Sequence, residues 1–325
     1  MSALTAIFQD ALHPAGPQAA HIADLWWLTL ATCAVVALVI WIVFVQGLWR
    51  APRADEATPP DISGLSTHER SLHRGVIWAT ALSTLGLIAL LAASVHTDRA
   101  LAGMDVKDAL QLEVTANQWW WSITYDDPDP TRMFVTANEI HVPVNRPVVV
   151  LLTSNDVIHS FWVPNLHGKR DLIPGHQITM TFRADQPGTY RGQCAEFCGL
   201  QHAFMAFTVV AETPDAFNAW ADAQRKPAPE PADENVKRGK SLFLSGACMM
   251  CHNIAGTPAW GRKGPDLTHL ASRPTLAAGT LANNHDNLVA WIRDPQKIKP
   301  GVNMPANTLV AEDEQALVAY LETLK

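Results

Sequence analysis

Two long apolar runs without a charged side chain constrain this sequence more than any other feature. They cover residues 25–49 and 76–95, and each provides the about 20 residues that a helix needs to cross a bilayer. A cleaved signal peptide is the alternative for the first run, but that run is too long and has no Lys or Arg before it. The sequence therefore predicts a transmembrane hairpin within residues 1–98, with spans at about 25–49 and 76–96.

The basic residues near the two runs predict the orientation of this hairpin. No Lys or Arg precedes residue 50, whereas the connection between the runs holds Arg50, Arg53, Arg70 and Arg74. Because basic side chains collect in cytoplasmic loops, we expect the connection inside the cell and the rest of the chain outside. Cys33 lies within the first run, which continues after it, so we interpret it as a membrane-buried thiol and not as a lipoprotein cleavage site.

Residues 99–220 show the pattern of a β-rich domain. The segments QLEVTANQWWWSITY, RPVVVLLTSND, HQITMTFRAD and AFMAFTVVAE are rich in β-branched and aromatic residues, and turn sequences such as DDPDP and QPGTY separate them. This pattern predicts short strands of a sandwich or barrel. The following ADAQRKPAPEPADEN has no apolar face and three prolines, which indicates a linker over 221–232.

Residues 233–325 are predicted to form a small helical domain. NVKRGKSLFLSGA and EDEQALVAYLETLK read as helices, and the second places its apolar residues on one face: Leu317, Tyr320, Leu321 and Leu324. Residues 97–225 hold 9 basic and 15 acidic side chains, whereas residues 232–325 hold 10 and 9. Attraction between the two domains is therefore expected to guide their contact. The chain has no basic tract, so nucleic-acid binding is not expected.

A CxxCH motif at Cys248, Cys251 and His252 predicts covalent haem c. The two thiols bond to the haem vinyl groups, and the histidine binds the iron. A thioredoxin-like redox pair is an alternative that needs a βαβ setting, and a zinc site is one that needs a second ligand pair. Neither context is visible in the sequence.

The second axial ligand of this haem is expected to be Met304, in GVNMPAN. A thioether raises the potential of a carrier haem, and Met249 and Met250 lie inside the attachment motif, so they cannot reach the opposite face. His269 and His285 remain alternatives. The segment resembles a class I cytochrome c, including GPDL at 264–267, and the resemblance implies that the Pro265 carbonyl orients His252.

QCAEFCGLQHAFM, residues 193–205, contains two cysteines, a histidine and a methionine. One interpretation is a disulfide between Cys194 and Cys198. The other is a metal site, because thiolate, imidazole and thioether together favour copper over zinc or calcium. A single copper suits two thiolates poorly, whereas two coppers bridged by both thiolates need only a second imidazole. His159, about 35 positions upstream, is the candidate for it, and His167 is the alternative.

The motifs NQWWWSITY, DVIHSFWVP, GKRDLIPG and GTYRGQCAEFCGLQHAFM, with the hairpin, make the whole chain resemble one family. It is similar to subunit II of haem-copper cytochrome c oxidases that carry a C-terminal cytochrome c domain, the caa3-type arrangement. The resemblance implies a multidomain membrane protein with a two-helix transmembrane hairpin, an all-β cupredoxin-like Greek-key barrel that holds a binuclear copper centre (CuA), and an all-α class I cytochrome c domain.

The resemblance also implies the copper ligands. Both thiolates bridge the metals, one copper takes an imidazole and the thioether, and the other takes an imidazole and a backbone carbonyl. The bridging residues are Cys194 and Cys198, the first copper takes His159 and Met205, and the second takes His202 and the carbonyl of Glu196.

Three further positions follow from the resemblance. The Glu196 side chain is implied as a ligand of a magnesium ion at the border with subunit I. Trp119 stands where electrons enter the copper centre; the alternative is that it only packs the barrel or rests at the membrane interface. Gly75 departs from the family, many members of which carry a glutamate there beside a proton entrance, and Glu69 lies too far upstream to replace it.

The function implied is electron input to a proton-translocating cytochrome c oxidase of a bacterial inner membrane, with the copper and haem domains on the periplasmic side. Haem c receives electrons from a cytochrome c or a quinol–cytochrome c reductase, and CuA passes them to haem a in subunit I. Subunits I and III are the implied membrane partners. The alternatives are a related reductase with an acceptor such as nitric oxide, and, from another class, a membrane copper chaperone or redox sensor, which needs no covalent haem.

Overall fold

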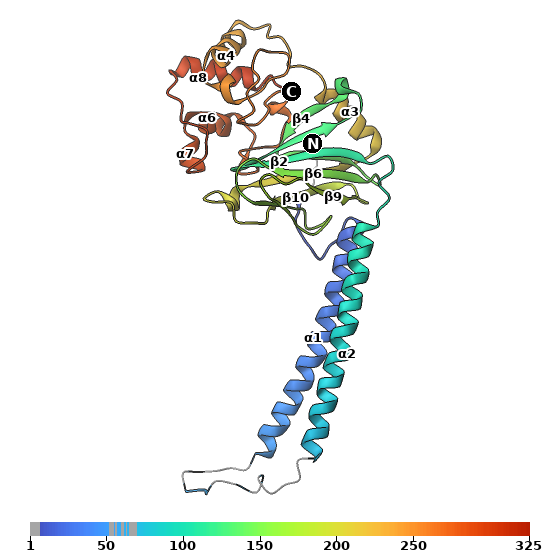
Figure 1. The fold of residues 1–325 in the computed structure, drawn as a ribbon. Coiled ribbons are helices and arrows are strands. Elements are labelled where there is room, and N and C mark those ends of the chain that lie inside the picture. Colours follow the sequence, from blue (N-terminus) through green and yellow to red (C-terminus); the bar gives the residue numbers. More distant parts are fainter. Residues whose placement is uncertain (1–6, 52–54, 56, 60–61, 63, 65–69) are drawn as a thin grey trace. The chain divides into compact units, whose positions relative to one another are not determined.

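The computed structural model describes residues 7–51, 55, 57–59, 62, 64 and 70–325. The chain forms two compact units (Figure 1). One is His21–Gly103, and the other joins the described residues up to Ala20 with Met104–Lys325. Arg53 and Glu69 lie outside the described residues, as does the Arg70 side chain.

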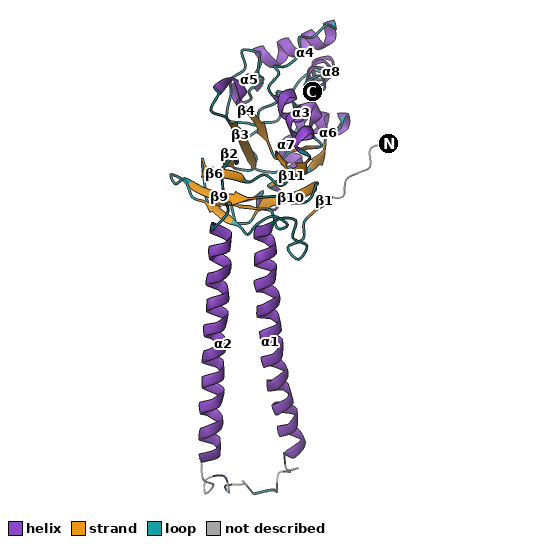
Figure 2. Ribbon diagram, turned by 90° about the vertical axis from the view of Figure 1, so that its right-hand side faces the viewer, coloured by secondary structure: helices purple, strands orange, loops and turns teal. Residues whose placement is uncertain are grey.

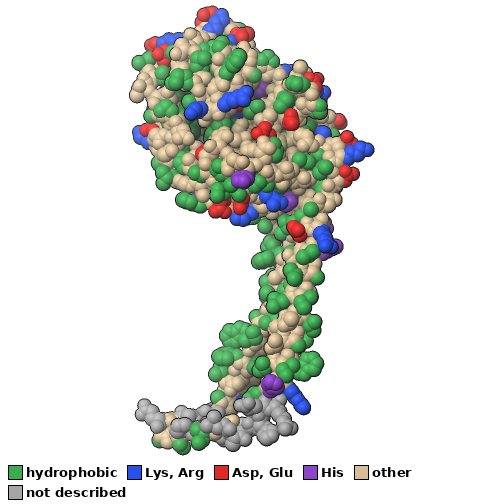
Figure 3. Space-filling model, viewed as in Figure 1, with side chains coloured by type: hydrophobic (Ala, Val, Ile, Leu, Met, Phe, Trp, Pro, Cys, Tyr) green, Lys and Arg blue, Asp and Glu red, His purple; other side chains and the backbone are tan. Residues whose placement is uncertain are grey.

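Helices α1 (Pro17–Arg50) and α2 (Arg70–Ala102) form the hairpin. Pro17–Arg50 and Leu72–Ala102 are long and apolar enough to cross a membrane, and an 18-residue window within each has a mean hydropathy of 2.8 and 2.1, respectively. Their apolar side chains are uncovered (Figure 3), as lipid-facing side chains are. The hydroxyls of Thr29 and Thr32 donate to the carbonyls four residues earlier, so neither polar group is left without a partner in an apolar setting.

Two sheets form the β-domain, which we define as strands β1–β11 with helix α3, and it confirms the predicted all-β fold (Figure 2). One sheet has the order β5-β11-β10-β7-β8, with β1 beside β10, and the other has the order β4-β3-β2-β6-β9. The strands are β1 Ile7–Phe8, β2 Leu110–Asn117, β3 Trp120–Asp126, β4 Phe134–Ala137, β5 Glu139–Pro143, β6 Val148–Ser154, β7 His159–Trp162, β8 Arg170–Leu172, β9 Ile178–Phe182, β10 Gly188–Cys194 and β11 Ala206–Glu212, and α3 is Pro214–Gln224.

The β-domain core lies between the two sheets and extends to Cys194, Cys198 and Met205, which are candidate metal ligands. Side chains along β6 alternate between buried and half-buried positions, as expected for strands with one face on a core. Trp121 lies fully buried among Phe161, Phe207 and the ring of His159 in edge-to-face contacts. Aromatic packing of this kind holds the rings rigidly, so His159 is positioned by the core itself.

The segment before α1 also belongs to this domain, which the sequence did not reveal. Strand β1 pairs in parallel with β10. Ala15 N–H donates to the Asn165 carbonyl over 2.7 Å, and Asp185 N–H donates to the Ala15 carbonyl over 2.8 Å. Gly16 passes so close that a Cβ there would lie 2.0 Å from the Arg183 carbonyl oxygen.

The helical domain, Glu234–Lys325, is small and loop-rich as predicted. Its helices are α4 Glu234–Ser245, α5 Cys248–Cys251, α6 His285–Arg293, α7 Pro295–Ile298 and α8 Ala311–Leu321, and its short strands are β12 Thr275–Leu276 and β13 Leu281–Ala282. The predicted apolar face of the last helix is buried. Helices α4 and α8 cross closely at Gly239, which has no side chain. A Cβ there would lie 1.9 Å from the Ala316 carbonyl oxygen.

The expected linker is held against both domains. Helix α3 continues to Gln224, four residues into the segment 221–232. Arg225 Nε donates to the Arg132 carbonyl of the β-domain, and Ala228 N–H donates to the Ala255 carbonyl of the helical domain. Fewer residues between the two domains are therefore free to act as a flexible tether than the expected linker 221–232 would provide.

Candidate metal and haem sites

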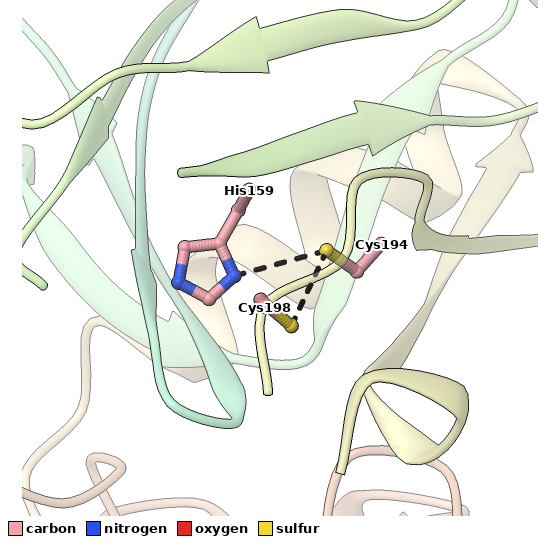
Figure 4. Close-up of side chains that lie close together, drawn as sticks. All are labelled: His159, Cys194 and Cys198. Atoms are coloured by element: carbon pink, nitrogen blue, oxygen red, sulfur yellow. Dashed lines mark hydrogen bonds between the residues drawn. The ribbon is translucent and has the colours of Figure 1, made fainter. Parts of the chain in front are cut away.

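Strands β7 and β10 bring three candidate ligands together. His159 begins β7, Cys194 ends β10, and Cys198 lies in the loop that follows. Figure 4 shows the imidazole of His159 facing the Cys194 sulfur, with Nδ1 3.7 Å from Sγ, and the two sulfurs 3.7 Å apart. Both thiols are free and buried. Their ligand atoms and that of His159 lie within 4.8 Å of one another, which is the spacing of a cluster that can share metal ions.

The rest of the loop supplies the other expected ligands. His202 Nδ1 lies 3.7 Å from Cys198 Sγ, Met205 Sδ lies 3.9 Å from the same sulfur, and the Glu196 carbonyl oxygen lies 3.2 Å from Cys194 Sγ. A donor set of two thiols, two imidazoles, a thioether and a carbonyl fits copper better than harder ions. His167 lies apart from this set, with its Nδ1 beside the Gly168 carbonyl.

Hydrogen bonds orient the ligands from outside the cluster. His159 Nε2 bonds to Asp156 Oδ1 over 2.7 Å, which leaves Nδ1 facing the thiols. A carboxylate behind an imidazole fixes the ring and increases its basicity. Asp156 also accepts from the backbone N–H groups of Gln118 and Val157. Asp156 is a functional residue that the sequence reasoning missed, and its position three residues before His159 was the available signal.

Neighbouring groups shift the pKa values within the cluster. A hydrogen bond from Cys198, with help from His159, lowers the pKa of the Cys194 thiol to about 3 despite its burial. The pKa of Cys198 is raised because it shares its proton with Cys194 and is buried. Burial lowers the pKa of His159, but Asp156 and Cys194 outweigh it and raise that pKa. The site thus favours a thiolate, the form that binds metals.

Trp119 contacts the loop that follows β10, which holds the candidate ligand Cys198, directly. Its indole Nε1 donates to the Cys198 carbonyl over 2.9 Å, and Gln118 Nε2 donates to the same oxygen over 2.7 Å. Trp119 is only 7% exposed. Gly199 follows in a left-handed conformation with φ +108°, and a Cβ there would lie 3.1 Å from the indole. The Glu196 side chain points elsewhere and lies 3.6 Å from Lys169 Nζ.

The haem-attachment motif lies on the short helix α5. His252 Nδ1 donates to the Pro265 carbonyl over 2.7 Å, which leaves Nε2 available as a ligand. Burial lowers the pKa of His252, so the ring is held neutral. Gly264 passes over this ring, and a Cβ there would lie 2.5 Å from its Cε1. Cys248 and Cys251 are free thiols on the same turn. These residues fit a covalently attached haem.

The three candidates for the second axial ligand lie in different settings. Met304 is half-buried in the loop before α8, and its carbonyl accepts from Gln296 Nε2 over 2.9 Å. His269 Nε2 lies 3.1 Å from the carbonyls of Gln224 and Lys226. His285 pairs with Glu322 over 2.9 Å. Each histidine uses one ring nitrogen in these contacts, and His269 Nδ1 is buried without a described partner, so Met304 stays a prediction from the sequence.

The fold and these sites define a class: a membrane-anchored electron-transfer protein with a β copper domain and a haem domain. A family model described as cytochrome c oxidase subunit II, periplasmic domain, matches residues 127–212, and one described as cytochrome c matches 236–325. These matches imply copper and haem as the cofactors. Among curated relatives, the cytochrome c oxidase subunit 2 of Alkalihalophilus pseudofirmus is 34% identical over 97% of this chain and 90% of that one.

Two further relatives carry the same name. The cytochrome c oxidase subunit 2 of Bacillus subtilis (strain 168) is 31% identical over 98% of this chain and 92% of that one. That of Bacillus sp. (strain PS3) is 33% identical over 77% of this chain and 74% of that one. This chain belongs to the cytochrome c oxidase subunit 2 family, which confirms the resemblance seen in the sequence.

Proposed function

We propose that this chain is the electron-input subunit of a membrane-bound cytochrome c oxidase. Electrons pass from the haem of the helical domain to the copper site of the β-domain and on to subunit I, where oxygen is reduced. The observation that carries this proposal is the cluster of Cys194, Cys198 and His159 in a chain that also holds the CxxCH turn. The relatives named cytochrome c oxidase favour oxygen over nitric oxide as the final acceptor.

The copper ligands proposed are the six residues of the loop and β7. Cys194 and Cys198 would be shared by two coppers, His159 and Met205 would complete the ligands of one, and His202 and the Glu196 carbonyl those of the other. When bound, such a pair supplies one-electron redox chemistry. The protein's own part is to hold the donors rigidly, through the packing of His159 against Trp121 and the hydrogen bond that His159 Nε2 donates to Asp156. A rigid ligand set changes little when the charge changes, so transfer needs little reorganisation.

The proposed haem ligands are His252 and Met304, with Cys248 and Cys251 as the covalent attachment. The Pro265 carbonyl keeps the His252 ring in one orientation. Trp119 is the proposed point where electrons reach the copper site, because its indole bonds directly to the backbone of a bridging cysteine.

The proposed setting is a bacterial inner membrane. Both large domains lie on the periplasmic side, as the distribution of arginines indicates. Subunit I and subunit III are the proposed partners in the membrane, and a cytochrome c or a quinol–cytochrome c reductase is the proposed donor. Glu196 is the proposed contribution of this chain to a magnesium site at the border with subunit I. Its side chain is accessible, with Lys169 as its described partner.

Copper stoichiometry tests the proposed function. The purified chain is expected to hold two coppers and to show a mixed-valence paramagnetic signal, and Cys198→Ser should abolish both. Cys33→Ser is the matched control, because this thiol is exposed on α1 and lies outside the cluster. A disulfide between Cys194 and Cys198 in active, fully metallated protein would contradict the proposal.

A further inference from the structure

Lys299 is a buried cation between two domains. It follows helix α7 and is only 1% exposed. Its Nζ donates to the carbonyls of Phe204, Ala277 and Trp119 over 2.8, 3.0 and 3.4 Å. Phe204 and Trp119 belong to the β-domain, whereas Ala277 belongs to the helical domain. One ammonium group therefore joins three chain segments from both sides of the domain boundary.

Burial of the charged Lys299 side chain is unfavourable in free energy unless the two domains stay in contact. Among the described residues no carboxylate lies within ion-pair distance of its Nζ, and burial lowers its pKa to about 8. An ammonium removed from water is stabilised only when each of its donors finds an acceptor. Two of the three acceptors belong to the other domain, so separation of the domains would leave this group without them.

The residues after Lys299 extend the same contact. Gln201 Nε2 donates to the Pro300 carbonyl over 2.7 Å. Gly301, in a left-handed conformation with φ +88°, comes so near that a Cβ would lie 3.0 Å from Leu200 and 3.8 Å from Trp119. Val302 packs against the β-domain core. This segment leads directly into Met304, so the loop with the proposed haem ligand is seated on the tryptophan that bonds to Cys198.

A second contact lies on the other side of Lys299. Ala206, the first residue of β11, donates its N–H to the Ala278 carbonyl over 3.1 Å. Ala278 is adjacent to Ala277, which accepts from Lys299. The amide of Ala206 therefore reports directly on whether the helical domain is seated.

Three basic residues of helix α4, near the haem motif, form ion pairs with nearby carboxylates. Arg238 pairs with Asp313, Lys237 with Glu234, and Lys240 with Glu230 of the linker segment. These ion pairs partly neutralise the basic side chains. The described cross-domain hydrogen bonds include those of Lys299 and its neighbours and the one between His269 Nε2 and the Gln224 carbonyl of α3. The three acceptors of Lys299 are neutral carbonyls, so this contact is separate from the general attraction between opposite charges, which stays a prediction from the sequence.

We propose that Lys299 is the positioning residue that seats the helical domain on the β-domain and holds the Met304 loop over Trp119. The proposal rests on the proposed function for its purpose, since a fixed seat keeps the donor and acceptor of an electron at one separation. The contact that Lys299 makes between the two domains involves protein groups alone, so it can be tested separately from the activity of the cofactors.

Hydrogen exchange at the Ala206 amide tests the proposal in the purified complex. Lys299→Met keeps the length of the side chain but removes its charge and donors. Exchange at Ala206 is expected to become about tenfold faster, because loss of charged hydrogen bonds favours the separated state. Exchange in the β2–β6 pairing, which lies within the β-domain, should stay as in the parent, together with the copper and haem spectra.

Lys297→Met is the matched control. It is two residues away, its side chain is 84% exposed, and its partner is Asp294, so Ala206 should exchange as in the parent. Lys299→Arg keeps the charge and should give a rate between those of the parent and Lys299→Met. Unchanged exchange in Lys299→Met, an equal increase in Lys297→Met, or an equal increase throughout β2 and β6 would overturn the proposal.

A second variant covers the case in which Lys299→Met does not fold. Gln201→Leu removes the neighbouring bond to the Pro300 carbonyl and is expected to give a smaller increase at Ala206. No increase in that variant would also contradict the seating. Copper and haem contents are measured on the same samples. Their absence would reject the proposed function, whereas the exchange rates judge the role of Lys299 alone.

Discussion

The indole Nε1 of Trp119 donates a 2.9 Å hydrogen bond to the carbonyl of Cys198. Cys198 is one of the two proposed bridging ligands, and a Cβ on Gly301, in the loop that leads to Met304, would lie 3.8 Å from the Trp119 ring. A single side chain thus contacts the proposed copper loop on one side and the proposed haem loop on the other. This arrangement gives Trp119 a role that packing alone would not require.

Replacement of Trp119 by Phe should slow electron transfer from haem to copper while the copper spectrum persists. The change keeps an aromatic ring but removes the hydrogen bond to Cys198, which contributes about 1 kcal/mol to the seating of the ring. Flash photolysis of the purified complex measures the rate. Trp120→Phe is the control, since Trp120 lies next in sequence on β3. Equal rates in the parent and Trp119→Phe would indicate that Trp119 only packs the barrel.

Replacement of Met304 by Ala should lower the haem potential and remove the sulfur-to-iron charge-transfer band. Thioether ligation stabilises the ferrous state, and axial ligands span a range of about 0.8 V. A redox titration with an optical spectrum measures both. Met250→Ala is the control, because Met250 is exposed within the attachment motif. A retained band in Met304→Ala would assign the sixth ligand to another residue.

His141 should make the stability of the β-domain depend on pH. Its ring lies between Glu139 and Glu212, at 2.9 and 2.8 Å, and stacks on Trp220. Burial lowers the pKa of His141, but the two carboxylates outweigh it and raise this pKa above the ordinary 6.5. The stabilisation is therefore complete below about pH 6.5 and is lost as the pH rises through the folded-state pKa.

Thermal unfolding at about pH 6 and about pH 9 measures this effect. The parent should lose stability across the interval, whereas His141→Gln should be less stable at the lower pH by about 1–3 kcal/mol and change less with pH. Tyr125, which bonds to the backbone of His141, stays neutral over this range because burial raises its pKa. An equal pH dependence in the parent and the variant would assign the titration to another group.

Gly239→Ala should destabilise the helical domain. The added methyl group would lie 1.9 Å from the Ala316 carbonyl and 2.8 Å from Tyr320 Cβ, so α4 and α8 must move apart. Overpacking of this kind costs about 1–3 kcal/mol. Ser241→Ala, on the exposed side of the same helix, is the control. Denaturant unfolding followed by haem absorbance measures both, and equal midpoints would show that the helices adjust freely.

The sequence by itself determined the local features whose physical cause is local. Two charge-free runs predict membrane-spanning helices, alternating apolar residues predict strands such as β6, and CxxCH places two thiols and an imidazole on one turn. The spacing of Cys194, Cys198, His202 and Met205 likewise confines those donors to one loop. All of these depend on neighbours within about one turn or one strand.

Tertiary structure alone decided what depends on residues far apart in the chain. Only the pairing of β7 with β10 sets His159, and not His167, beside Cys194, and only packing places Asp156 behind that imidazole. The N-terminal segment pairs with β10 across about 180 residues. Lys299 looks like an ordinary surface lysine in the sequence, but its three acceptors come from segments 22, 95 and 180 residues away. No local pattern encodes such contacts, because burial and hydrogen-bond partners arise only when separate segments meet.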